Sequence, residues 1–116
     1  MMGPDEGVVD RGSVQLFYAL GYLYGEHGET KRGLVLLLLA ARLAPDDVCI
    51  LRTLVHAFLL DDAPERAIAV INRLRSMPDA DHPALDLLMG RALWACGRQI
   101  EARRSFRDFL ERRGEP

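Results

Sequence analysis

The chain repeats itself at an interval of 34 residues, and this interval limits the folds open to it more than any other feature. Large apolar and small side chains recur from position 17 to position 51 and, after one extra residue, at position 86. The first set is Phe17, Leu20, Gly21, Tyr24, Gly33, Leu37, Ala40 and Pro45. The later sets are Leu51, Leu54, Val55, Phe58, Ala67, Ile71, Leu74 and Asp79, then Asp86, Met89, Gly90, Leu93, Ala102, Phe106, Phe109 and Gly114. A period in the thirties is typical of stacked helical hairpins.

Six segments carry apolar side chains at the three- and four-residue spacing of an amphipathic helix. They are residues 13–26, 29–43, 48–60, 65–76, 84–96 and 99–113. Ser13 is expected to cap the first helix, and the pairs Asp46-Asp47 and Asp61-Asp62 to supply caps for the third and fourth. Since no run alternates as a half-buried strand does, the sequence predicts an all-helical chain.

One small residue in each repeat marks the point where the two helices of a hairpin are expected to cross. These residues are Gly33, Ala67 and Ala102. A side chain larger than alanine would force the two axes apart. Gly21 and Gly90 are expected to serve the same contact from the first helix, whereas Val55 indicates a looser middle hairpin.

This pattern resembles the tetratricopeptide repeat over residues 14–116. The resemblance implies an all-α fold of three tetratricopeptide-like helical hairpins stacked as a short right-handed solenoid. The repeats would be about 14–47, 48–81 and 83–116, making one domain over 13–116 after a flexible N-terminal tail at 1–12. A one-residue shift would place Leu85 instead of Asp86 at the first motif position of the third repeat. A six-helix bundle with accidental spacing is the alternative.

Composition excludes several classes of protein. The chain has 116 residues, 49% hydrophobic and 28% charged, which is the balance of one ordinary globular domain. Its 15 basic and 17 acidic side chains give a net charge of −2, so nucleic acid is not expected as a partner. The longest apolar run, Leu34 to Ala41, is too short to span a membrane. That run is apolar all round its helix, so it is either buried within the chain, as we expect, or covered by another chain.

The sequence does not predict an enzyme, a metal site or a cofactor. Its three histidines are scattered, and no catalytic or phosphate-binding motif occurs. Cys49 and Cys96 lack metal-ligand or redox spacing and are expected to be reduced core residues. The arginines of the last helix are expected to be solvated, with a docking surface for an acidic protein as the alternative. They are Arg103, Arg104, Arg107, Arg112 and Arg113.

The first helices of stacked hairpins line a concave surface that such folds use for binding. The residues expected there are Tyr18, Tyr22, Arg52, His56, Leu59, Leu87, Arg91 and Trp94. Aromatic and arginine side chains are enriched where protein partners dock, so the predicted ligand is a peptide or a helix. For any one of the aromatic residues, packing against its own neighbours explains its presence equally well.

Two stretches are similar to the YscY family of type III secretion chaperones. They are QLFYALGYLYGEHGETKRGLVLLLLAARLAP and EARRSFRDFLERRGEP. The resemblance implies a cytoplasmic bacterial protein without enzymatic activity. It would hold a small exported YscX-type partner in a 1:1 heterodimer and bring it to the export-gate protein of the secretion apparatus. The alternative is a general tetratricopeptide scaffold that binds short peptides.

Overall fold

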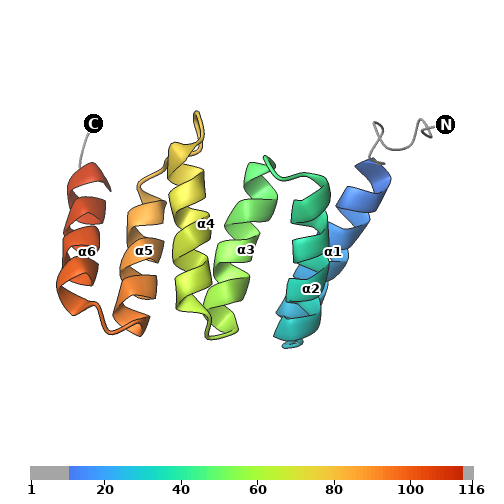
Figure 1. Cartoon of the computed structure of the whole chain (residues 1–116), viewed down its shortest axis with the longest axis horizontal. Helices are drawn as coiled ribbons and strands as arrows, with labels where there is room; N and C mark the ends of the chain where they lie inside the picture. The colour runs from blue at the N-terminus through green and yellow to red at the C-terminus, as the bar shows by residue number, and fades with distance from the viewer. Residues whose placement is uncertain (1–10, 114–116) are drawn as a thin grey trace. The chain divides into compact units, whose positions relative to one another are not determined.

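The computed structural model describes residues 11–113, which form six α-helices joined by short turns (Figure 1). The helices are α1 (Arg11–Glu26), α2 (Thr30–Leu43), α3 (Val48–Leu60), α4 (Pro64–Ser76), α5 (Ala84–Ala95) and α6 (Gln99–Arg113). No strand occurs within residues 11–113. The all-helical prediction is confirmed, and each helix end lies within two residues of its expected position.

The chain divides into two compact units between Ala57 and Phe58, inside α3. The first unit holds α1, α2 and most of α3, and within it α1 packs along α2. The second unit holds the end of α3 with α4, α5 and α6, and within it α5 packs against both α4 and α6. None of the described helices is both long and apolar enough to cross a membrane.

The turns that join α1 to α2, α3 to α4 and α5 to α6 share one backbone geometry. Each contains a residue with positive φ: Gly28 at 82°, Asp62 at 57° and Gly97 at 82°. The next residue donates its N–H to the carbonyl five positions earlier, which closes the helix end. These bonds run from Glu29 to Tyr24 (2.8 Å), from Ala63 to Phe58 (2.8 Å) and from Arg98 to Leu93 (2.9 Å). The sequence period therefore recurs in the backbone of the turns.

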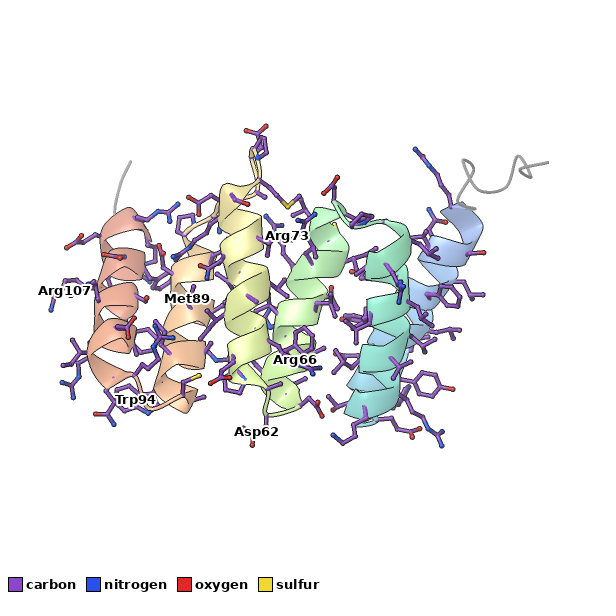
Figure 2. The ribbon with its side chains drawn as sticks, in the orientation of Figure 1. Asp62, Arg66, Arg73, Met89, Trp94 and Arg107 are labelled. Carbon is purple, nitrogen blue, oxygen red and sulfur yellow. The ribbon has the colours of Figure 1, made fainter. Side chains whose placement is uncertain are left out.

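Of the three expected helix caps, one is confirmed. The Oδ1 atom of Asp47 accepts the N–H of Ile50 at 3.1 Å, at the start of α3. Ser13 lies inside α1, because the helix already begins at Arg11. At α4 the N-cap is Ala63, without a side-chain hydrogen bond. The preceding Asp62, labelled in Figure 2, instead supplies the left-handed residue that this turn requires and that Asp tolerates better than most.

The close crossing predicted for the first hairpin is confirmed. A Cβ atom on Gly33 would lie 2.6 Å from the carbonyl oxygen of Gly21, and a Cβ on Gly21 would lie 2.8 Å from Cγ of Leu37. The two helix backbones therefore touch where the residues have no side chains. Ala67 and Ala102, the small residues of the later repeats, are fully buried.

The predicted burial of the Leu34 to Ala41 run is wrong for three of its eight residues. Leu34, Leu37 and Ala40 are buried, but Val35, Leu38 and Leu39 are exposed. The reason is geometric, since α2 has neighbouring helices over only part of its circumference. The apolar side chains on the remaining part face solvent.

The cysteines also lie differently from the prediction. Cys49 and Cys96 form no disulfide, but Cys49 is exposed and Cys96 half-buried, so neither is a core residue. At the N-terminus, Arg11 and Gly12 belong to α1, not to the tail expected at 1–12. The rest of that expected tail lies outside the described residues.

The crossing at Gly33 generates a stability prediction with a matched control. Gly33→Ala should lower the free energy of unfolding by about 1–3 kcal/mol, because the added methyl group meets backbone and the helices have to separate. Gly25→Ala is the control, since nothing lies within 4 Å of a Cβ at this helical glycine. It should raise stability by about 0.5–1 kcal/mol. Urea unfolding followed by circular dichroism measures both, and an equal effect of the two changes would contradict the crossing.

Candidate partner-binding site

Three of the predicted binding residues form an exposed row along α5. Leu87, Arg91 and Trp94 stand four and three positions apart, which places them on one face of a helix. All three are exposed, and Trp94, which Figure 2 labels, keeps 48% of its surface open to solvent. A half-exposed tryptophan beside an arginine has the composition of a protein-binding surface.

A shallow pocket lies against this row. It has a volume of about 420 Å³ and is lined by Arg91, Trp94 and Phe106 of α6. Gly90 shapes it, because a Cβ at that position would overlap the ring of Phe106. The missing side chain lets the ring lie close against α5. The pocket thus offers an aromatic ring, an indole and a guanidinium to a ligand.

A buried ion-pair cluster holds α5 between its two neighbours. The carboxylate of Asp86, one residue before the row begins, is almost fully buried. It accepts a hydrogen bond from Arg75 of α4 on Oδ1 and one from Arg112 of α6 at 2.9 Å on Oδ2. One side chain therefore ties three helices together and fixes the position of the exposed row.

This cluster explains why an acid stands where the repeat pattern expects a large apolar residue. Leu85 and Asp86 are both buried, so both candidates for that motif position face the interior. The expectation of a solvated arginine cluster is wrong for Arg112, which also lies 3.5 Å from Asp81. Burial by itself would lower the pKa of Arg112, but the charges of Asp86 and Asp81 outweigh it and raise the pKa.

The other arginines of α6 differ among themselves. Arg113 lies over the ring of Phe109 at 5.9 Å, a cation–π contact within its own helix. Arg103, Arg104 and Arg107 are exposed, as expected (Figure 2 labels Arg107).

In the first unit, Tyr18 makes a hydrogen bond between two helices. Its hydroxyl lies 3.2 Å from Oγ1 of Thr53, which connects α1 to α3. Thr53 donates its single hydroxyl hydrogen to the carbonyl of Cys49 at 2.9 Å, so Tyr18 must be the donor in the bond between the two hydroxyls. Tyr18 is half-buried and hydrogen-bonded, which supports the structural explanation for this tyrosine.

The four remaining residues predicted for the binding surface differ in how exposed they are. Tyr22, one turn after Tyr18, is half exposed, and Arg52 and His56 are exposed on α3. Arg52 is the direct neighbour of Thr53, so the bond from Tyr18 brings α1 close to this part of α3. Leu59 is half-buried near the end of α3. Of the predicted binding residues in the first unit, Tyr22, Arg52 and His56 are thus the exposed ones.

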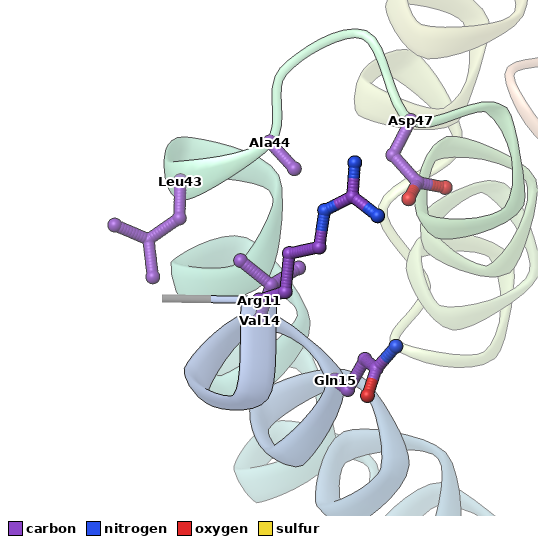
Figure 3. Close-up of a pocket in the computed structure, with 6 residues that line it drawn as sticks. All are labelled: Arg11, Val14, Gln15, Leu43, Ala44 and Asp47. Carbon is purple, nitrogen blue, oxygen red and sulfur yellow. The ribbon is translucent and has the colours of Figure 1, made fainter. Parts of the chain in front are cut away.

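A second pocket, which no sequence motif predicts, lies at one end of the first unit. It has a volume of about 450 Å³ and is lined by Arg11, Val14, Gln15, Leu43, Ala44 and Asp47. Figure 3 shows the guanidinium of Arg11 pointing into this space. One oxygen of Asp47 is already occupied in capping α3. Within residues 11–113, no group of three or more metal-ligating side chains gathers here or elsewhere.

No model of a known protein family and no curated protein matches the chain. The exposed residues on α5 and in the first unit, together with the repeat pattern, are therefore the basis for a functional proposal.

The Asp86 cluster generates a second stability prediction. Asp86→Asn keeps the shape of the side chain but removes the charge that faces Arg75 and Arg112. It should lower the free energy of unfolding by about 1–3 kcal/mol, because a buried charged hydrogen-bond acceptor is lost. The control is Asp81→Asn, whose half-exposed carboxylate should contribute less than about 1 kcal/mol. Thermal unfolding of both variants measures the difference, and equal stabilities would show that Asp86 does not anchor α5.

Proposed function

We propose that this chain is a cytoplasmic, non-enzymatic chaperone of type III secretion, which binds a small exported YscX-type protein in a 1:1 complex. The single observation that carries the binding role is the half-exposed Trp94 beside Arg91 and Phe106, at a pocket on α5 and α6. Apolar side chains that cluster at one exposed place mark protein-interaction sites more than scattered single ones do, and here an indole and a phenyl ring line the same pocket. The chaperone role itself rests on the resemblance of the two quoted stretches to the YscY family.

We also propose that the chain has the architecture of three tetratricopeptide hairpins. The recurring turn at Gly28, Asp62 and Gly97 supports this, since three hairpins of one geometry need three equivalent turns. The close contact of Gly21 with Gly33 supports it as well, because the repeat places its small residues at the helix crossing. Such folds bind extended or helical peptides along the first helices of their hairpins.

A helical segment of the partner suits the row on α5. The row formed by Leu87, Arg91 and Trp94 extends over two turns of α5. Its intervals of four and three residues equal those between the apolar side chains on one face of an amphipathic helix. Trp94 and the ring of Phe106 would take an apolar side chain, and Arg91 an acidic one. Tyr22, Arg52 and His56 provide a second contact surface for the same partner. Delivery to the export-gate protein would follow from this complex.

The test is co-expression with a YscX-type protein from the same genome, followed by titration of the purified components. Trp94→Ala should weaken binding by about 2 kcal/mol or more, which corresponds to a roughly 30-fold higher Kd. The reason is that the complex would lose a tryptophan side chain that the partner covers. Ile100→Ala on α6 is the control. Its side chain is even more exposed than Trp94 but lies outside the row, so binding should not change.

Two outcomes would contradict the proposal in different ways. If no complex forms with the YscX-type protein, the secretion role is wrong and a scaffold that binds short peptides becomes the better explanation. If a complex forms but Trp94→Ala and Tyr22→Ala leave its Kd unchanged, the partner uses another surface. Circular dichroism of each variant separates lost binding from lost helix content.

A further inference from the structure

The first helix exposes leucines at positions that are buried in the other two repeats. Leu16, Leu20 and Leu23 are 55%, 36% and 50% exposed. Their counterparts 34 and 69 residues later are at most 9% exposed: Ile50, Leu54 and Ala57, then Leu85, Met89 and Ala92. This side of the repeat is therefore a packing surface in the second and third repeats and an open surface in the first.

Helix geometry places these leucines on the side of the hairpin opposite α3. At 100° per residue, Leu16, Leu20 and Leu23 lie on the side of α1 away from Tyr18, which contacts α3 through Thr53. On α2, the exposed Leu39 and Leu43 lie away from the buried Leu34 in the same way. We call these five leucines the N-terminal face.

Within residues 11–113, the α1 side of the N-terminal face consists of apolar side chains. Terminal repeats of helical stacks normally carry a polar outer surface, which keeps the protein from associating. Two exposed arginines of α2 border the leucines: Arg32 lies on the same side of the helix as Leu39, and Arg42 directly precedes Leu43. Arg32, at the turn end of the face, is paired with Glu29 at 3.4 Å. The α1 part of the face is therefore apolar, and the charged side chains lie on its α2 side.

The spacing of the leucines on α1 fits a copy of itself. Intervals of four and three residues, as from Leu16 to Leu20 to Leu23, are those of the core positions in packed helix pairs. A second α1 related by a two-fold axis offers the same intervals in the opposite direction, so each leucine meets leucine. Two-fold dimers with one shared patch are the commonest assemblies of soluble proteins.

The size of the face suits a dimer. The 16 residues of α1 make a helix about 24 Å long, and two helices side by side are about 20 Å wide. The footprint of both helices is therefore about 480 Å² on each copy, or about 960 Å² in total, so α2 has to take part beside α1 for the interface to approach the lower bound of about 1,000 Å². A mainly apolar interface with leucines at its centre is typical of homodimers.

We propose that the N-terminal face is a homodimer interface, in which α1 of one copy packs against α1 of a second copy. This goes beyond the proposed chaperone function and does not depend on it. The leucines involved belong to α1 and α2, whereas the candidate partner site is on α5 and α6. Failure of one proposal therefore leaves the other standing.

Sedimentation velocity of the full chain alone, over a micromolar concentration series, tests the proposal. The wild type should sediment as a dimer that dissociates on dilution. Leu16→Lys with Leu23→Lys should raise the dimer Kd at least 100-fold, because charges would then be buried against leucine. Ile100→Lys, at an exposed apolar side chain of α6, is the matched control and should leave the dimer intact. A monomeric wild type, or a dimer that survives the double change, overturns the proposal.

Disulfide trapping gives a second test that does not depend on the lysine variants folding. In a chain with Cys49→Ser and Cys96→Ser, Leu20→Cys lies at the centre of the α1 row and should form a covalent dimer on mild oxidation. Ile100→Cys in the same background should stay monomeric. If both cysteines cross-link equally, contact is nonspecific and the proposed interface is wrong. If neither does, α1 does not pack on α1.

Discussion

Steric exclusion at the crossing of α1 and α2 sets the geometry of the first hairpin. At Gly21 and Gly33 the backbones come so close that neither residue could carry a side chain without movement. The distance between the two helices then determines which other side chains can meet, so Leu37 fills the space beside the crossing and is buried. The outer leucines of the same helices are left without a neighbour in the chain. One contact between glycines thus determines both the interior of the hairpin and its apolar surface.

In the second unit an ion-pair cluster positions the helices, whereas in the first unit the close contact of two glycines does so. Asp86 is inaccessible to solvent and depends on two arginines from different helices. A buried carboxylate costs more than a leucine would, because its desolvation must be offset by well-placed donors. The carboxylate accepts its hydrogen bonds from Arg75 of α4 and Arg112 of α6, so these two helices must lie where the arginines can reach it. The row formed by Leu87, Arg91 and Trp94 is therefore held at a defined rotation of α5.

Local signals in the sequence were sufficient to predict the helices. Proline, glycine and aspartate at the turns located every helix end within two residues, and glycine pairing predicted the first crossing. The pattern predicts a cap at Asp61-Asp62, and this is wrong because the sequence does not show that the turn needs a positive φ at Asp62. The Asp86 cluster was missed because its partners are 11 and 26 residues away. Leu20 was grouped with Leu54 and Met89, although burial at that position depends on which element lies beside it, and periodicity carries no such information.

The contact between Gly90 and Phe106 limits which residues of this pocket can be substituted during evolution. The floor of the pocket is an aromatic ring lying against bare backbone, so any side chain at position 90 would displace the ring. Substitutions that change which ligand binds are then expected at Arg91 and Trp94, which line the pocket opening. Substitutions at Gly90 are not expected, because they would move the ring of Phe106. Related chains that recognise different ligands would be expected to diverge at the rim and to keep glycine beneath it.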